Sequence, residues 1–515
     1  MAQRPVAIRV YARWPGVAAA ALVLALTLGT LVVVANRAQS ASLSAADWAA
    51  VRFTVLQATC SAVVSVGLAI PAARALARRR FFGRGALVTV LGAPFILPVI
   101  VAIFGILAAF GRNSVLSSVL GWFGLPPMSL YGLHGVVLAH VFFNLPLATR
   151  LILQGWLSIP AERFRLAASL NAPVGRLLEW PMLRAVAPGV FIIVFLLCLT
   201  SFAVALTLGG GPKATTIELA IYQALRFDFD LGKAALLGLV QFGLCAVVAL
   251  GAWAVALPEQ LGAGLDRVVE RWDRGGKVPD AFWIGLVTLF LALPLGMVFW
   301  RGIPGWSQMP GSVWLAAVRS LGVVALSVML MLVLSLALTL SPKNGSGLRA
   351  NLFIGNLPLA TSPLVLGTGL FLLIFPLGWV SGFALPVTAL VNAVMCLPFA
   401  VAALTPAVAQ AEAGYGRLAT SLGLHGWPRL RWLILPRLRR PLGFATGLTA
   451  ALSMGDLGVI ALFAGQRSET LPLAMSRLMG AYRMDAAAGA GLLLLMLSFS
   501  LFWLFDQGGR VDAET

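Results

Sequence analysis

Residues 165–171 read Arg165-Leu166-Ala167-Ala168-Ser169-Leu170-Asn171, and residues 417–423 read Arg417-Leu418-Ala419-Thr420-Ser421-Leu422-Gly423. The stretches lie 252 residues apart (417 minus 165), and both lead through basic residues to a proline step, at Trp180-Pro181 and Leu435-Pro436. The apolar segments before them keep the spacing, since Asn144-Leu145-Pro146 matches Cys396-Leu397-Pro398. A repeat about half the chain long indicates a duplicated structural unit. A polar loop kept in both halves of an apolar chain predicts a docking surface in each half.

The composition is that of a membrane protein. Of the 515 residues, 60% are hydrophobic and only 11% are charged, and long apolar runs recur along the chain. A helix of about 20 apolar residues spans the bilayer core. Continuous apolar runs predict helices, because strands of a membrane barrel alternate. The expected fold class is therefore an all-α polytopic membrane protein.

About twelve transmembrane helices are expected, six in each half. Their approximate ranges are 16–35, 54–76, 86–110, 132–154, 188–208, 233–256, 282–300, 314–340, 351–376, 383–406, 442–463 and 485–505. An even number of spans in each half makes the repeat parallel and not inverted. The first run resembles a signal peptide but is too long for a typical one, so a retained first helix is expected.

The charge distribution predicts the orientation. The net charge is +19 (37 − 18), and arginine clusters at Arg78–Arg80, Arg267–Lys277 and Arg429–Arg440 all fall in loops of one side. Cytoplasmic loops carry the excess of Lys and Arg in membrane proteins. Both repeated loops and both termini are therefore expected in the cytoplasm. This rule accounts for the basic charge, so no nucleic-acid partner is expected.

The same topology sets the expected domain boundaries. Residues 1–50 would form the N-terminal helix and a periplasmic loop, and 51–257 the first half. Residues 258–312 would form a cytoplasmic linker and the seventh helix, 313–506 the second half, and 507–515 a cytoplasmic tail. Residues 257–281 are the only long charged linker, which marks the boundary between the halves.

The repeated loops resemble the EAA loop of ABC importer permeases, whose pattern runs Glu-Ala-Ala, three residues, Gly, nine residues, Ile-x-Leu-Pro. In the second copy Gly423, Leu433 and Leu435-Pro436 fall at the family spacing, with Arg417 at the glutamate position. In the first copy Arg165 replaces the glutamate, Asn171 replaces the glycine, and the Pro181 step comes three residues early. The resemblance implies that each loop is a helical hairpin at the membrane surface that couples to an ATPase.

The turn of each hairpin carries its own prediction. Asn171 and Gly423 directly follow the Ser-Leu pair that closes the first helix. Helices commonly end at a residue with left-handed backbone angles, usually Gly and next Asn. Positive φ is therefore expected at both positions.

The resemblance extends over nearly the whole chain and is densest in the first half. The stretches Val51–Leu107, Tyr131–Ala148 and Leu208–Leu225 look like the fused permease of bacterial thiamine importers. It implies the type I ABC importer permease fold in the bacterial inner membrane, with the lipid bilayer as its environment. It also implies three kinds of partner: two copies of a cytoplasmic ABC ATPase subunit, a periplasmic solute-binding protein, and a small-molecule substrate, thiamine or its phosphates. The permease itself would not be an enzyme.

One glycine-rich stretch superficially resembles a phosphate-binding loop. Gly209-Gly210-Gly211-Pro212-Lys213 has the wrong spacing for Gly-x-x-x-x-Gly-Lys-Ser/Thr and is expected outside the cell, where there is no ATP. We interpret Gly209, Gly210, Gly211 and Lys213 as a turn that re-enters toward the pore or meets the binding protein.

Three polar side chains inside predicted spans are candidates for the translocation path: His140, Asn144 and Asp456. Polar and charged groups are costly in a bilayer, so each needs a reason. Asp456 either lines or gates the path, or it pairs with a basic group, Arg319 being the first partner to test. His140 either lines the path or is a hydrogen-bonded core histidine. Thiamine is a cation, which a carboxylate and the aromatic faces of Phe142-Phe143 would suit; core packing also accounts for these rings.

Neither a metal site nor a cofactor is expected. The four cysteines, Cys60, Cys198, Cys245 and Cys396, all lie in apolar runs without metal-type spacing. Three alternatives stay open: a permease for iron(III) or another small solute, a 12-helix secondary transporter with parallel halves, and a membrane-embedded enzyme. A secondary transporter usually has its cytoplasmic signature between the second and third helices, whereas the repeated loops here follow the fourth and tenth.

Overall fold

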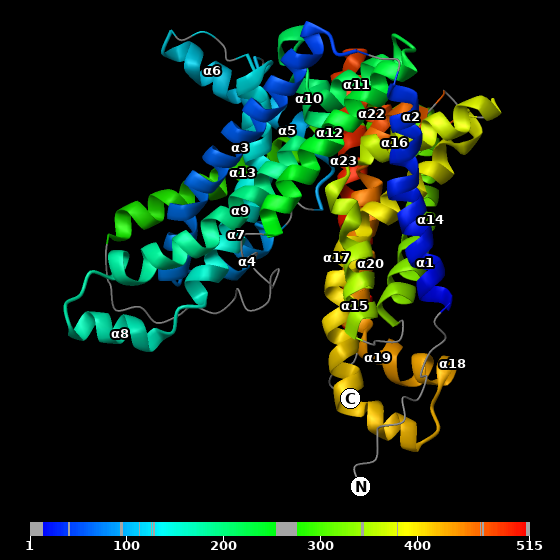
Figure 1. Ribbon diagram of the computed structural model, residues 1–515. Coiled ribbons are helices and arrows are strands. Elements are labelled where there is room, and N and C mark those ends of the chain that lie inside the picture. Colours follow the sequence, from blue (N-terminus) through cyan, green and yellow to red (C-terminus); the bar gives the residue numbers. More distant parts are fainter. Residues whose placement is uncertain are drawn as a thin grey trace. The chain divides into compact units, whose positions relative to one another are not determined.

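The computed structural model describes residues 14–39, 42–92, 96–112, 114–124, 126, 129–253, 276–340, 345–378, 380–463, 465 and 468–510 (Figure 1). Throughout these residues the regular structure is helical, which confirms the all-α fold class. Most of the charged linker between the halves, the extreme N-terminal arginines and the last five residues lie outside the described residues.

Ten of the described helices are long and apolar enough to cross a membrane. They cover Trp14–Ala38, Ala45–Arg78, Leu133–Leu157, Gly175–Leu199, Leu231–Gly251, Lys277–Gln308, Gly311–Leu340, Gly382–Ser421, Arg439–Phe463 and Met484–Gly509. The pair Ala350–Ala360 and Pro363–Leu377 is apolar enough only when taken together and is bent by 91°, which is the geometry of a broken span or of a re-entrant loop.

The structure does not confirm the expected count of twelve. The expected helix at 86–110 is two short helices, α4 (Arg84–Val90) and α5 (Val99–Phe110). Pro98 precedes α5 with extended backbone angles (φ −57°, ψ 131°). Proline lacks the amide that would continue a helix from the preceding turn, so α5 begins after it.

The contacts divide the chain into two compact units. One contains Ala41–Pro310 with Ala474–Leu495, and the other contains Met1–Ser40, Gly311–Leu473 and Met496–Thr515. The first span (α1, Trp14–Leu24, and α2, Thr30–Ala38) is therefore grouped with helices of the second half. The domain boundaries expected along the chain remain a prediction.

Within the unit of the first half, α3 (Ala45–Arg78) packs against α7 (Leu133–Leu157), α9 (Trp180–Leu199) and α13 (Lys277–Gly305). The α13 helix also packs against the short α5. Ser44 and Asp47 start α3 with a reciprocal capping box, which satisfies two amides that a helix N-terminus otherwise leaves unpaired.

Within the unit of the second half, α14 (Gly311–Leu340) takes the place of α3. It packs against α17 (Val380–Ser421) and α20 (Arg439–Met454), and α16 (Pro363–Ile374) packs against α2. Both units thus repeat one packing scheme. In each unit a short helix, α5 or α16, packs against a span from the other half of the sequence, α13 or α2 respectively.

A hydrogen bond that is repeated in both units supports the duplication. The Thr54 hydroxyl of α3 accepts a bond from the Ile217 amide at 2.9 Å, where α11 (Ile217–Arg226) begins. The Ser320 hydroxyl of α14 accepts a bond from the Leu471 amide at 2.8 Å, where α22 (Leu471–Gly480) begins. Each hydroxyl satisfies one of the orphan amides of a helix N-terminus.

Candidate functional site

The repeated loops form two hairpins, which we call hairpin 1 (residues 158–181) and hairpin 2 (residues 410–437). In hairpin 1, α7 ends at Leu157 and a separate helix, α8 (Ala161–Ser169), follows (Figure 1). In hairpin 2, α17 runs without interruption to Ser421, and the short helices α18 (Gly426–Arg429) and α19 (Leu435–Arg437) return the chain. The difference has a local cause, because Pro160 stands where hairpin 2 has Glu412.

The structure confirms positive φ at both turn residues, 48° at Asn171 and 68° at Gly423. In hairpin 1 the Asn171 amide donates to Ala168 O at 3.2 Å and the following amide donates to Ala167 O at 2.8 Å. Hairpin 2 has the same pair of bonds at 3.1 and 2.9 Å. Both turns are therefore Schellman motifs, which satisfy the last carbonyls of the first helix.

Each hairpin then contains one π-helical turn, at Gly175–Glu179 and at Leu430–Ile434. These turns lie 255 residues apart (430 minus 175), directly before Trp180-Pro181 and Leu435-Pro436. The three-residue difference in loop length therefore lies between the turn and the π-helix. Short π-helical turns occur frequently at functional sites.

Both hairpins expose the same face. Leu166 and Leu170 are 60% and 68% exposed, and the matching Leu418 and Leu422 are 56% and 67% exposed. The alanines between them, Ala167 and Ala419, are buried, and so anchor the helices. Four residues separate the leucines of a pair, so they lie on one helix face. Arg165, Ala168, Ser169, Arg417 and Ser421 are also exposed. The hydroxyls of Ser169, Thr420 and Ser421 donate to backbone carbonyls of their own helices.

Two of the candidate pathway residues, His140 and Asn144, lie together in α7. The Ser61 hydroxyl is 3.2 Å from His140 Nδ1. Asn144 Nδ2 donates to the His140 carbonyl at 2.9 Å and to Cys198 Sγ at 3.3 Å. All four side chains are buried, and His140 Nε2 has no hydrogen-bond partner among the described residues.

The other candidate, Asp456, belongs to the second-half unit and lies between α20 and α21 (Gly458–Phe463). The first backbone amides of α21 and the side chain of Asn392 interact with its carboxylate. Its Oδ2 atom is buried without a hydrogen bond within the described structure. Both Asp456 and Arg319 are described, and no ion pair joins them.

The second-half unit contains a polar cluster that was not predicted from the sequence, at positions that match the cluster of His140 and Cys198 in the first half. Asn392 Nδ2 donates to the Ser453 hydroxyl at 3.2 Å, and Ser453 lies 2.9 Å from the Ser327 hydroxyl. Asn392 follows His140 by 252 residues (392 minus 140), and Ser453 follows Cys198 by 255 (453 minus 198). Each unit thus has a buried polar cluster at the matching place, which the repeat spacing could have revealed.

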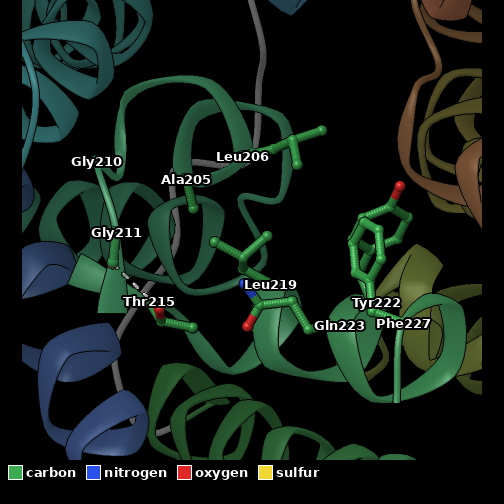
Figure 2. A pocket seen from close by; sticks show the side chains of 9 residues that line it. All are labelled: Ala205, Leu206, Gly210, Gly211, Thr215, Leu219, Tyr222, Gln223 and Phe227. Atoms are coloured by element: carbon green, nitrogen blue, oxygen red, sulfur yellow. Dashed lines mark hydrogen bonds between the residues drawn. The ribbon is translucent and has the colours of Figure 1, made fainter. Parts of the chain in front are cut away.

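The glycine-rich turn borders a cavity of about 240 Å³ (Figure 2). Gly210 and Gly211 line it together with Thr215, Leu219 and the aromatic residues Tyr222 and Phe227, among others. The two glycines have positive φ, 75° and 120°. A Cβ atom at Gly210 would lie 2.9 Å from Tyr131 Cβ, so this turn needs glycine for close approach as well. Gly209 and the exposed Lys213 do not line the cavity.

The described residues contain no cluster of three or more His, Cys, Asp or Glu side chains that could hold a metal ion. The four cysteines are free, and three of them are buried.

Comparison with known proteins gives full-length relatives, although no family model matches. The chain is 40% identical over 526 residues to the thiamine transport system permease protein ThiP of Salmonella typhimurium, which covers 97% of each chain. The ThiP protein of Escherichia coli K12 is 38% identical over 518 residues, with 96% of each chain covered. The ThiP protein of Brucella abortus (strain 2308) is 38% identical over 483 residues, covering 91% of this chain and 89% of the relative.

Proposed function

Because this chain belongs to the family of thiamine transport system permease proteins, we propose that it forms the translocation path of an ATP-driven, binding-protein-dependent importer. Thiamine is the proposed substrate, because the relatives are thiamine transport permeases, and its phosphates are proposed with it. The family consists of ABC transport permeases and not of enzymes. ATP hydrolysis therefore belongs to separate subunits.

The observation that carries the proposal is the pair of matched hairpins. Each presents two exposed leucines on one helix face, held by a Schellman turn and a π-helical turn at matching places. Fully burying one leucine side chain is worth about 1.5–3 kcal/mol. An exposed leucine pair on a basic hairpin is well suited to a cleft in a partner protein. Two hairpins in one chain accordingly suggest two ATPase subunits in each complex.

The chain is a multi-pass inner-membrane protein, as the apolar helices and the relatives support. We place both hairpins and both termini in the cytoplasm, because arginine clusters occupy the hairpins and the linker between the halves. The turn Gly209–Gly211 with Lys213 then lies on the periplasmic side. There it would contact the solute-binding protein or re-enter toward the path.

His140, Asn144 and Asp456 are the proposed pathway residues. His140 and Asn144 are buried and Asp456 is half-buried, and both His140 Nε2 and Asp456 Oδ2 are buried atoms without a hydrogen-bond partner among the described residues. A carboxylate that is not ion-paired with Arg319 suits the passage of a cation such as thiamine.

Uptake by the reconstituted complex tests the function. The permease, its ATPase and the loaded binding protein in proteoliposomes should accumulate labelled thiamine only when ATP is present on the ATPase side. Accumulation driven by a proton gradient without ATP would contradict the proposal and would favour a secondary transporter.

A further inference from the structure

We propose that Glu179 and Arg429 are positioning residues that attach the returning segments of the two hairpins to different membrane helices, that of hairpin 1 to α3 and that of hairpin 2 to the end of α17. Their role in coupling rests on the proposed function, whereas the attachment itself follows from the contacts.

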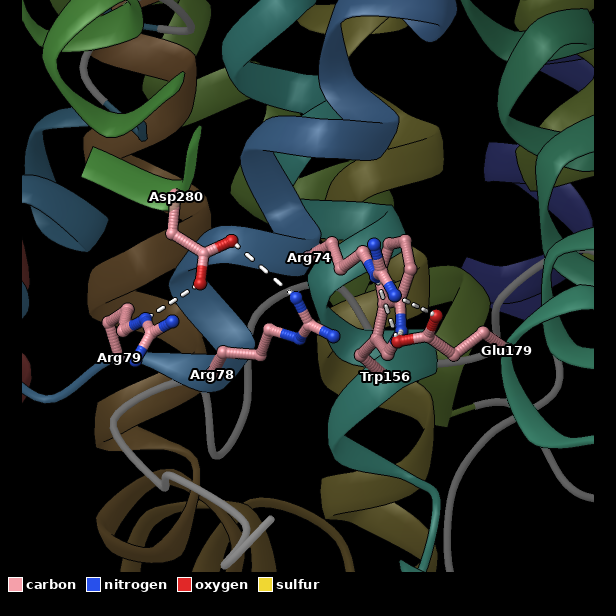
Figure 3. A network of polar contacts seen from close by, with 6 residues as sticks. All are labelled: Arg74, Arg78, Arg79, Trp156, Glu179 and Asp280. Carbon is pink, nitrogen blue, oxygen red and sulfur yellow. Dashed lines mark hydrogen bonds and ion pairs between the residues drawn. The ribbon is translucent and has the colours of Figure 1, made fainter. Parts of the chain in front are cut away.

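The attachment of hairpin 1 is an ion pair to α3. Glu179, in the π-helical turn, is 4% exposed. Arg74 of α3 binds both of its carboxylate oxygens, at 3.0 and 2.8 Å, and Trp156 Nε1 donates to Oε1 at 3.3 Å (Figure 3). A bidentate arginine fixes both position and angle of a carboxylate. The π-helical turn of hairpin 1 is therefore held on α3 and on the end of α7.

The same end of α3 is tied to a further helix. Arg79 Nε donates to Asp280 Oδ2 at 2.6 Å, and Arg78 Nη1 lies 3.7 Å from Oδ1 of the same carboxylate (Figure 3). Asp280 lies in the first turn of α13. The terminal turns of α3 thus connect α13 and hairpin 1, so that a movement of either reaches the other through α3.

The α8 helix itself is joined to α7 by a break. Pro160 has extended backbone angles (φ −62°, ψ 143°) between α7 and α8. Proline cannot donate the hydrogen bond that would continue α7. The orientation of hairpin 1 is therefore not dictated by continuation of α7, and the bonds of Glu179 to Arg74 and Trp156 contribute to holding it.

In hairpin 2 the returning segment is attached to α17, the helix that leads into the hairpin. Glu412 lies within the uninterrupted α17, and Arg429 in the returning segment donates from Nε to Oε1 at 3.2 Å and also bonds Oε2 through Nη2. A third bond from Nη1 reaches the Thr420 hydroxyl at 3.4 Å. The Arg429 side chain is 2% exposed. The returning segment is therefore fastened to α17.

A glycine makes room for this attachment. A Cβ atom at Gly416 would lie 3.0 Å from Glu412 Oε2 and 3.1 Å from Arg429 Nη2. A second contact fastens the hairpin again, since the Arg437 guanidinium lies 3.4 Å from the ring centre of Tyr415. The returning segment of hairpin 2 is thus held on α17 at two places, so the two should move together.

The sequence shows that each attachment is present in one hairpin and absent from the other. Pro160 occupies the place of Glu412, and Ile434 occupies the place of Glu179. Neither hairpin contains the acidic residue of the other attachment. The two ATPase subunits would therefore receive motion from different membrane helices of the same chain.

Spin labels on the hairpins test the attachment without ATPase or substrate. In the purified permease, with Cys60 replaced by serine, a nitroxide is placed at Leu170 of hairpin 1 or at Leu422 of hairpin 2. Arg429→Leu should increase the mobility of the Leu422 label and leave the Leu170 label unchanged. Glu179→Gln should do the reverse. Arg431→Leu and Glu162→Gln remove an exposed charge from the same hairpins and should alter neither label.

The attachment is refuted if Arg429→Leu mobilises both labels or neither. Should Arg429→Leu fail to accumulate, Glu412→Gln removes the same contact from the partly exposed side and carries the same expectation. Arg429→Lys keeps the charge but loses the bidentate bond, so it should give partial mobility.

The complete complex with ATPase and binding protein tests whether the two attachments couple ATP hydrolysis to transport. Glu179→Gln and Arg429→Leu should each reduce thiamine transported per ATP hydrolysed relative to the wild-type complex. Variants that mobilise their label but keep the wild-type ratio would refute the coupling role. A wild-type complex without ATP-dependent thiamine uptake would instead refute the proposed function, and the label result would be unaffected.

Discussion

Replacing the turn residue of hairpin 2 by valine separates backbone conformation from every other contribution. Gly423 has a φ of 68°, and no neighbouring atom lies within 4 Å of a Cβ added there. A Cβ atom therefore meets no other residue there, and the left-handed backbone angle is the main expected cost of valine. Asn171 in hairpin 1 has a φ of 48° and is exposed, so the same reasoning applies to Asn171→Val.

The left-handed conformation costs an ordinary L-residue about 1–2 kcal/mol. That free energy corresponds to a factor of about 5–30 in the equilibrium between the native turn and other conformations. The hairpin tip carries little of the buried core, so the membrane helices should fold normally. The loss should appear as weaker docking of the ATPase.

The measurement is ATPase activity stimulated by the loaded binding protein in proteoliposomes, with co-purification of the ATPase alongside. Gly423→Val and Asn171→Val should lower both. Asn171→Gly and Gly423→Asn are the matched controls and should be nearly silent, because Gly and Asn tolerate positive φ. Full stimulation and full ATPase retention by the valine variants would show that this turn does not couple the two proteins.

Three further outcomes are expected. Asp456→Asn should reduce thiamine uptake at a nearly normal level of protein in the membrane, and a normal uptake rate would assign the carboxylate a structural role only. Reporter fusions after Arg84 and after Tyr482 should report opposite sides of the membrane, and the same side for both would overturn the topology. Gly210→Val should abolish uptake, because its Cβ would lie 2.9 Å from Tyr131 Cβ at a φ of 75°; wild-type uptake would mean that the turn rearranges without consequence.

The hairpin turns were predictable because their determinants are local. A residue with left-handed backbone angles directly after a helix is usually Gly or Asn. The repeat identified this position in both hairpins. The exposed leucine pairs follow from the same seven residues. The attachments at Glu179 and Arg429 were not predictable, because their partners lie in other helices or beyond the turn.

The lengths of the helices were harder to predict. The sequence predicted a helix over 383–406, yet α17 continues past Pro406 to Ser421. Prolines are tolerated inside membrane helices where neighbouring groups satisfy the freed carbonyls. Hydropathy likewise predicted one helix over 86–110, because an apolar average does not register a backbone break at Pro98.

The packing of the first span with second-half helices was not predictable either. Apolar periodicity describes which face of a helix is buried but not which partner covers it, and a membrane span is apolar all round. His140 and Asn144 were identified from the sequence, but their partners Ser61 and Cys198 and the cluster around Asn392 were missed, because serine, cysteine and asparagine are ordinary residues in such helices. Only alignment of the two halves reveals that they match.

Crosslinking from the two exposed leucine faces tests the central claim most directly, namely that both hairpins dock an ATPase. Single cysteines replace Leu170 in hairpin 1 or Leu422 in hairpin 2, and a short bifunctional reagent is added to the assembled complex. The account predicts a crosslinked ATPase subunit from each position, and two ATPase subunits on one permease chain when both cysteines are present. Crosslinks from one hairpin alone, or from neither, would contradict it.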